Sequence, residues 1–391
     1  MNKSKLLYAS PFSPVKSGIS EYSEILVSEL IKYFDVTLYT DDYELESNFL
    51  KSNCRIVKEK EDNIDFEEYE YRIYNIGNNP YAHQYLYEKC LKYPGMIILH
   101  DLVLYYLFIG YHFQKGDMFA AIYQNEGMEC FKKIKRTVNM DNQLGLENKK
   151  LASQFALNKE IIESGNKIMV HSEYALQKIK ELSPETCVRQ IPMIRQVHKE
   201  FENIDRDVLF EKYGIPKDKM ILASFGYIGE TKLNDLICRV VKKIVETENL
   251  NVCYLMVGEG DFANEYVDNE IIYKLGYTDI DEFNSFISYS DVVLNLRYPS
   301  MGETSASMLR IMEMGKACII NNDGWFREIP DACAQKIPIN HIEYHLENTL
   351  VDLIRNEEKR IQIGQAARTY VEHEYDTEKI IKSIMDFLAE K

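Results

Sequence analysis

A strand–helix–strand pattern at residues 291–331 constrains the fold of this chain more than any other feature. Residues 292–296 form a mostly apolar run with the length of a buried strand, and residues 317–320 form a second. Between them, a loop leads into a helical stretch that ends at Gly315. Two strands joined through a helix pair in parallel by a right-handed crossover, which leaves a crevice at their carboxyl ends. The pattern therefore predicts an α/β fold with a ligand site at the start of the helix.

This helix is predicted to open with Glu303, Thr304 and Ser305, followed by Ala306 and Ser307. The free N–H groups and the positive dipole end of such a small, polar N-terminus bind an anion such as a diphosphate. A carboxylate repels phosphate, so Glu303 is expected to face uncharged hydroxyl groups beside the anion. An anion and hydroxyl groups in one pocket indicate a sugar nucleotide.

Six segments of the chain, in order, resemble those of the family 4 retaining glycosyltransferases, which have the GT-B fold. Residues 291–331 are similar to the donor-site pattern of that family. The other five segments are PFSPVKSGISEYSEIL (11–26), YNIGNNPYAHQYLYEKCLKYPGMIILHDLVL (74–104), IMVHSEYALQKI (168–179), ASFGYIGETKLNDLI (223–237) and LMVGEGD (255–261). The resemblance implies an α/β fold of two Rossmann-like, doubly wound domains that face each other across a cleft. It also implies transfer of a sugar from a UDP-, GDP- or dTDP-linked donor to a glycan or lipid-linked acceptor, with retention of configuration.

The composition agrees with an enzyme of this kind. With 391 residues the chain is long enough for two domains. Its net charge of −16 argues against a nucleic-acid partner. No apolar run approaches the ~20 residues that span a bilayer, the N-terminus does not resemble a signal peptide, and the cysteines lack CxxC spacing. We therefore expect a cytoplasmic protein, and the resemblance adds bacterial surface-polysaccharide biosynthesis.

Alternating strands and helices predict two domains. The first spans 1–195, includes a helical insertion at about 102–165 and, by the resemblance, binds the acceptor. The second spans 196–374 and binds the nucleotide sugar, while a final helix at about 375–391 is expected to return to the first domain. The predicted strands are 6–9, 36–39, 72–75, 96–99 and 167–170 in the first domain, and 220–225, 252–257, 271–275, 292–296, 317–320 and 335–337 in the second.

Five residues of the first domain are candidates for the site. Gly18 opens a helix after the first strand, where a glycine lets the backbone approach a ligand or only makes a turn. His100 and Asp101 follow a strand at its carboxyl end, and the resemblance places His100 against the donor sugar near the reacting carbon. Asp101 is a candidate for binding the acceptor and could orient the imidazole. The alternatives are a histidine satisfied at a domain interface and an Asp101 that only caps the next helix. Asn78 and Asn79 could bind the acceptor or only form a turn.

The glycine loop of the second domain is a candidate for binding the diphosphate through Gly229 and Lys232. The family usually places an arginine after the first glycine of this loop, whereas this chain has Tyr227. Arg297 or Arg310 could supply the missing positive charge, or could pair with a nearby carboxylate.

Two further features concern the nucleoside. The family pattern has a second glutamate eight positions after the first, but Ile311 stands eight positions after Glu303, so no residue is assigned to the ribose. Tyr277 follows a short strand where the family commonly holds the nucleotide base through backbone contacts. The base is therefore not readable from the sequence.

The mechanism implied by the resemblance uses no metal and no cofactor. The chain has no Asp-x-Asp motif at a strand end. Residues 304–307, Lys232 and Arg297 would stabilise the leaving diphosphate. The acceptor hydroxyl would attack from the face that the diphosphate leaves, and the departing phosphate oxygen would take the proton. Glu303 would orient the sugar, and His100 would stabilise developing positive charge.

A basic cluster lies in the helical insertion and comprises Lys132, Lys133, Lys135 and Arg136. Such a cluster can contact an anionic membrane surface or a polyprenyl-diphosphate-linked acceptor, or can simply be a solvated helix face.

Two other functions remain open at this point. A GT-B sugar-nucleotide epimerase would need no acceptor and would have an acid/base carboxylate pair in its cleft. A non-catalytic GT-B partner subunit would bind the donor without turning it over.

Overall fold

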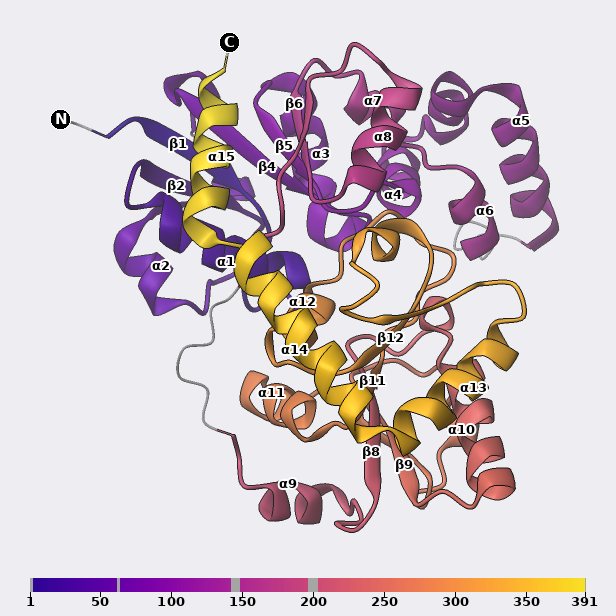
Figure 1. The fold of residues 1–391 in the computed structure, drawn as a ribbon. Coiled ribbons are helices and arrows are strands. Elements are labelled where there is room, and N and C mark those ends of the chain that lie inside the picture. The colour runs from indigo at the N-terminus through magenta and orange to yellow at the C-terminus, as the bar shows by residue number, and fades with distance from the viewer. Residues whose placement is uncertain (1–2, 62–63, 142–147, 196–202, 391) are drawn as a thin grey trace. The chain divides into compact units, whose positions relative to one another are not determined.

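The computed structural model describes residues 3–61, 64–141, 148–195 and 203–390 of the chain, which form two units (Figure 1). The first unit comprises Met1–Arg195, Met301–Thr304 and Thr377–Lys391, and the second comprises Gln196–Ser300 and Ser305–Asp376. The domain boundary predicted at 195/196 adjoins residues 196–202, which lie outside the described residues.

The first unit is built on a seven-stranded parallel sheet with strand order β3-β2-β1-β4-β5-β6-β7. The central strands are mostly buried and apolar because helices cover both faces of a doubly wound sheet. The strands are β1 Lys5–Ala9, β2 Asp35–Thr40, β3 Arg55–Lys58, β4 Tyr71–Ile76, β5 Met96–Leu99, β6 Lys167–Val170 and β7 Val188–Gln190. The helices are α1 Gly18–Leu30, α2 Asn48–Asn53, α3 Pro80–Lys92, α4 Tyr105–Lys115, α5 Met118–Asp141, α6 Lys149–Gln154, α7 Lys159–Ile162, α8 Glu173–Leu182 and α15 Thr377–Ala389.

The second unit is built on a six-stranded parallel sheet with strand order β10-β9-β8-β11-β12-β13. Its strands are β8 Met220–Phe225, β9 Val252–Val257, β10 Ile272–Gly276, β11 Val292–Leu294, β12 Cys318–Asn321 and β13 Gln335–Ile337. Its helices are α9 Arg206–Tyr213, α10 Asn234–Glu248, α11 Ile280–Tyr289, α12 Ala306–Glu313, α13 Ile342–Arg355 and α14 Glu357–Glu374.

The strand order places a topological switch point in each sheet. In the first, the chain winds outward from β1 to β2 and β3 and then returns to β4 on the other side. In the second, it winds from β8 to β9 and β10 and returns to β11. Ligands of doubly wound sheets bind at the carboxyl ends of the strands beside such a point. Ligand-binding residues are therefore expected in the loops after β1, β4, β8 and β11.

Helix α15 belongs to the first unit because its C-terminal turn is bonded to that sheet. The Lys167 ammonium on β6 donates hydrogen bonds to the carbonyls of Phe387 (2.8 Å) and Leu388 (3.0 Å). The Arg189 guanidinium on β7 lies 4.6 Å from the centre of the Phe387 ring.

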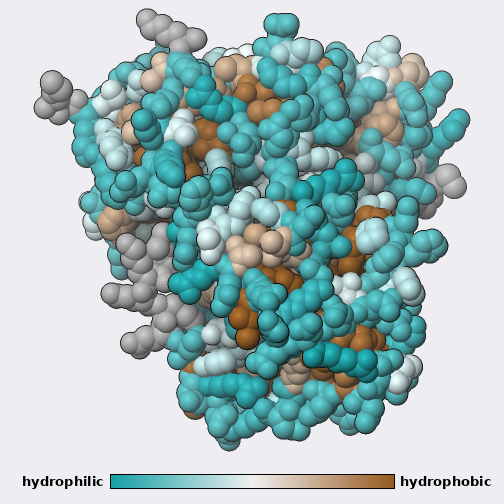
Figure 2. All heavy atoms as spheres, viewed as in Figure 1, coloured by the Kyte–Doolittle hydropathy of each residue, from teal (hydrophilic) through white to brown (hydrophobic). Residues whose placement is uncertain are grey.

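The surface matches the acidic, polar composition. Figure 2 shows hydrophilic residues over most of the face in view, with hydrophobic side chains in small separate areas. Among the described helices, none combines the length and the apolar character needed to cross a bilayer.

Candidate functional site

The loop after β8 presents a lysine at the switch point of the second sheet. Gly226 has φ +87°, and a Cβ atom on it would lie 2.8 Å from the Lys232 Nζ atom, so glycine makes room for this ammonium group. The ammonium donates a hydrogen bond to the Phe225 carbonyl (2.5 Å) at the end of β8. Lys232 is thereby positioned above the carboxyl end of the strand.

The backbone N–H groups of this loop have partners inside the protein. Gly226 N donates to the Val257 carbonyl (2.9 Å), and Ile228 N donates to the Glu259 carbonyl (2.6 Å). Gly229 N donates to Asn234 Oδ1 (3.1 Å). The loop was expected to bind a diphosphate through its glycine backbone and its lysine together. The Gly229 amide therefore has a partner within the protein, and the Lys232 ammonium lies beside the Phe225 carbonyl.

Arg297 begins the loop after β11, on the other side of the switch point. A fully buried side chain, Asn321, holds its backbone: Arg297 N donates to Asn321 Oδ1 (2.6 Å), and Asn321 Nδ2 donates to the Arg297 carbonyl (2.7 Å). Tyr298 N donates to the Thr231 carbonyl (2.7 Å), which ties this loop to the loop that carries Lys232. The segments that bear the two cations are thus bonded to each other.

Helix α12 begins at Ala306, later than predicted, because Ser305 is its N-cap. Ser305 Oγ accepts a hydrogen bond from Met308 N (3.2 Å) and one from Asn295 Nδ2 (3.3 Å), so it is committed to capping. The N–H groups of Ala306 and Ser307 have no intrahelical acceptor, as in the first turn of any α-helix. They are the groups of this helix that can face an anion.

Glu303 and Thr304 lie before this helix, in a segment that belongs to the first unit. Val103 N donates to the Met301 carbonyl (3.0 Å) within that unit. The Glu303 carboxylate accepts a hydrogen bond from Met301 N (2.7 Å), so one of its oxygens stabilises its own loop.

Tyr277 and Arg310 are the remaining candidates of the second unit. Tyr277 follows β10 and its side chain is exposed. Arg310 lies on α12 with its guanidinium carbon 5.6 Å from the centre of the Phe283 ring.

His100 lies at the carboxyl end of β5 in the first unit and is buried in a group of aromatic rings. Its ring centre is 4.8 Å from that of Tyr22 and 5.2 Å from that of His171, which follows β6. His100 Nε2 lies 2.9 Å from Asn75 Oδ1, so Asn75 orients the imidazole. Burial, together with His171 and His83 nearby, holds the pKa of His100 well below its usual value. The ring is therefore neutral near pH 7.

The other candidates of the first unit have hydrogen bonds of their own. Asn78 Oδ1 accepts from Tyr106 N (2.8 Å) at the start of α4, and Asn78 N donates to Asp101 Oδ2 (2.7 Å). Asn79 Oδ1 accepts from Tyr81 N (3.0 Å) and caps α3. Gly18 is exposed at the start of α1, and a Cβ atom on it would meet no atom within 4 Å. The protein itself therefore does not require glycine at this position.

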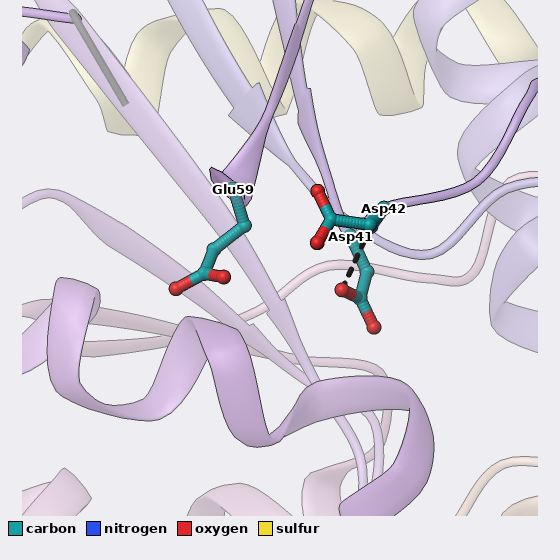
Figure 3. A group of neighbouring side chains, drawn as sticks. All are labelled: Asp41, Asp42 and Glu59. Carbon is teal, nitrogen blue, oxygen red and sulfur yellow. Dashed lines mark hydrogen bonds between the residues drawn. The ribbon is translucent and has the colours of Figure 1, made fainter. Parts of the chain in front are cut away.

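One group of three carboxylates in the described part of the chain has donor atoms close enough to share a cation, and it comprises Asp41, Asp42 and Glu59. Figure 3 shows these side chains following the ends of β2 and β3, with Asp42 N bonded to Asp41. The Lys60 ammonium lies 2.5 Å from an Asp42 oxygen, and this hydrogen bond lowers the pKa of Asp42. A lysine already supplies positive charge to this group.

The four basic residues of the insertion lie exposed on α5. Lys133 pairs with Glu129 (2.9 Å), and the Lys135 ammonium lies 5.2 Å from the centre of the Phe131 ring. Lys132 and Arg136 complete the cluster.

Four buried asparagines were not predicted from the sequence. Each one bonds to a segment that carries a candidate residue: Asn75 to His100, Asn234 to Gly229, Asn321 to Arg297, and Asn295 to Ser305. The available signal is an asparagine at the end of an apolar strand or the start of a helix, a place where polar residues also occur for capping alone.

Solved structures of the same fold confirm the predicted GT-B architecture. The chain is similar to sucrose-phosphate synthase from Thermosynechococcus elongatus, with 15% identity, a TM-score of 0.67, and 98% of each chain covered. It is also similar to WaaG, a glycosyltransferase involved in lipopolysaccharide biosynthesis, with 14% identity, a TM-score of 0.66, and 99% of this chain and 100% of that chain covered. HepE from Anabaena, in complex with UDP and glucose, has 13% identity, a TM-score of 0.64, and 99% of each chain covered.

These similarities establish the fold of the chain. No protein-family model and no curated protein sequence matches it. The chain therefore has the GT-B fold, formed by two doubly wound parallel α/β sheets.

Proposed function

We propose that this protein is a retaining glycosyltransferase that moves a sugar from a nucleotide-sugar donor to a glycan or lipid-linked acceptor. One observation carries the proposal. At the switch point of the second sheet, the loops bearing Lys232 and Arg297 are hydrogen-bonded to each other through Tyr298 N and the Thr231 carbonyl. Two cations beside the N-terminus of α12 suit a diphosphate. The same fold binds UDP and glucose in HepE, which supports a sugar nucleotide as the ligand.

The donor diphosphate in this proposal is bound by Lys232, Arg297 and the first-turn N–H groups of α12. These groups stabilise the negative charge that builds up as the leaving group departs. The acceptor hydroxyl attacks from the same face, and its proton passes to the departing phosphate oxygen. No divalent ion is needed because lysine, arginine and helix N–H groups already supply the positive field.

The reacting sugar is assigned to Glu303 and His100. The Glu303 carboxylate, which accepts from Met301 N, is assigned the orientation of a sugar hydroxyl. Positive charge develops on the sugar carbon as the diphosphate leaves. A charged imidazolium would repel this charge, whereas the neutral ring of His100 does not.

The acceptor side of the proposal includes an anionic membrane surface. Lys132, Lys133, Lys135 and Arg136 are exposed on one helix of an otherwise acidic chain. Each basic residue near an anionic surface contributes about 1 kcal/mol of attraction. Vesicles with phosphatidylglycerol should therefore bind the protein more tightly than neutral vesicles, and glutamate at Lys132 and Arg136 should abolish the difference.

The experiment that tests the proposed function is release of nucleoside diphosphate from UDP-, GDP- and dTDP-sugars in EDTA, with a bacterial lipid extract as the source of acceptors. One donor class should be consumed. Glu303→Ala should slow its turnover roughly 10²–10³-fold, as removal of a group that acts in the transition state does. If wild-type protein binds a donor and releases no diphosphate under any of these conditions, the protein is not a transferase.

A further inference from the structure

The two cation-bearing loops of the second unit are each held by one fully buried asparagine. We propose that Asn234 and Asn321 are positioning residues that set the distance between Lys232 and Arg297 so that both cations engage one diphosphate. The inference rests on the proposed function, because it concerns the same donor site. It deepens that function by identifying which buried groups determine affinity for the diphosphate.

Asn321 acts as a side-chain extension of the sheet. Regular pairing between β11 and β12 ends at Leu294 and Ile319, followed by the hydrogen bond from Asn295 N to the Ile319 carbonyl (2.9 Å). Beyond that point the Asn321 amide donates to and accepts from the Arg297 backbone, as a paired strand residue would. Because Asn321 is fully buried, no water replaces it. It therefore determines where Arg297 leaves the sheet.

Asn234 has the same function on the other side of the switch point. Its Oδ1 atom accepts from Gly229 N, and its Nδ2 atom donates to Ser224 Oγ (3.1 Å) and to Tyr254 Oη (3.0 Å). The two hydroxyl groups lie 2.7 Å apart, which closes a buried network between β8, β9 and α10. The network fixes Gly229, and Lys232 N donates to the Gly229 carbonyl (3.0 Å).

Backbone strain between these groups supports a positioning function. Leu233, which separates Lys232 from Asn234, has φ +55°, a conformation that is unfavourable for a non-glycine residue. Such a conformation persists when surrounding contacts determine it, and the Asn234 network supplies those contacts. The loop after β11 is bonded to the same turn through Thr231. The two asparagines thus fix the two loops on either side of the hydrogen bond between Tyr298 N and the Thr231 carbonyl.

The test is the affinity of UDP, GDP and dTDP, each alone, and of the matching monophosphates, measured by titration calorimetry. Asn321→Leu and Asn234→Leu keep the branch at Cγ and the number of side-chain heavy atoms, and they remove the hydrogen bonds. Each should weaken diphosphate binding roughly 10-fold, as loss of a well-placed charged hydrogen bond does. Monophosphate binding should change less than about twofold, since one phosphate does not need both cations.

Double variants separate positioning from general damage. In an Arg297→Ala background, Asn321→Leu should have no further effect on diphosphate affinity, and Asn234→Leu should have none in a Lys232→Ala background. Asn284→Leu is the matched control, because Asn284 is also buried in the second unit but lies on α11. It should leave both affinities unchanged.

Two results would overturn the inference and are distinguishable. If wild-type protein binds none of the three diphosphates, the proposed function fails and the inference fails with it. If wild-type protein binds one of them, but the asparagine variants lose affinity for diphosphate and monophosphate equally or add in full to the cation variants, only the inference fails.

Discussion

Individual buried polar side chains hold the candidate residues of each unit in place. His83, His100 and His171 are buried in the first unit, and burial lowers the pKa of each one. His83 Nδ1 lies 3.0 Å from the Asn75 carbonyl, and His171 Nδ1 lies 3.0 Å from the Ile191 carbonyl, so in both rings Nδ1 carries the proton. A carbonyl can only accept.

Because His83 and His171 are buried in neutral form, we expect the folded protein to lose stability in acid. The pKa of His83 and that of His171 each fall to about 4, so below pH 6.5 the unfolded chain binds protons that the folded chain does not. The free energy of unfolding should therefore decrease as the pH falls from about 6.5 toward 4, by up to roughly 3 kcal/mol for each histidine. Denaturant titrations at pH 7 and pH 5 measure this change.

His83→Asn is the informative variant for that experiment. The asparagine amide can still donate to the Asn75 carbonyl but cannot titrate. The variant should lose less stability between pH 7 and pH 5 than the wild-type protein. An identical loss in both proteins would show that His83 does not contribute.

Gly18 gives a second prediction for a single residue. Because a Cβ atom there meets no protein atom, Gly18→Ala should change the free energy of unfolding by less than about 1 kcal/mol. It should still weaken donor binding if the donor approaches this backbone. Gly364→Ala is the contrasting control, since its Cβ atom would lie 1.9 Å from the Gly315 carbonyl oxygen and should destabilise the fold. Unchanged donor affinity in Gly18→Ala would remove Gly18 from the site.

His112 connects helices of the insertion through hydrogen bonds to two carboxylates. His112 on α4 lies 2.8 Å from Asp117, which precedes α5, and 3.2 Å from Glu160 on α7. Tyr87 on α3 donates to the same Glu160 oxygen (2.9 Å). Burial alone would lower the pKa of His112, but the hydrogen bonds to Glu160 and Asp117 outweigh it and raise the pKa.

The interaction of His112 with Asp117 and Glu160 should weaken in alkaline solution. A histidine with a raised pKa stabilises the fold below its unfolded pKa, and that stability is lost as the pH rises through the folded value. Hydrogen-exchange protection factors of α7 should therefore be lower at pH 9 than at pH 6. Glu160→Gln keeps an acceptor for Tyr87 and should show a smaller difference. Equal protection at both pH values in wild-type protein would contradict the ion-pair account.

At the scale of elements, the sequence predicted the central strands of both sheets and the edge strands β10 and β13 of the second sheet, but it missed the edge strand β3 of the first. Mostly apolar runs marked the central strands of both sheets. The edge strand β3 was not predicted because it is short and carries Arg55 and Lys58. The start of α12 was predicted too early, since Glu303 and Thr304 suit a first helical turn as well as Ser305 suits a cap. Tertiary contacts, which no local pattern contains, decided between them.

At the scale of the whole molecule, the two sheets have the same doubly wound topology. Each begins with a central strand, β1 or β8, and each brings its candidate residues to the carboxyl ends beside its switch point. The sequence predicted these segments because glycines, cations and carboxylates follow apolar strands. It did not predict Asn234 or Asn321, because a buried asparagine has no periodicity and the tertiary fold decides which groups it bonds to.

The central claim is that this GT-B chain binds a nucleotide sugar without a metal ion. Thermal unfolding in EDTA with UDP-, GDP- and dTDP-linked sugars, beside the Glu303→Ala variant, tests it most directly. A donor at ~100-fold its dissociation constant should add about 2.7 kcal/mol of stability. We expect one nucleotide class to raise the melting temperature of wild-type protein, and the increase to be smaller in Glu303→Ala. No increase with any of them would contradict the claim.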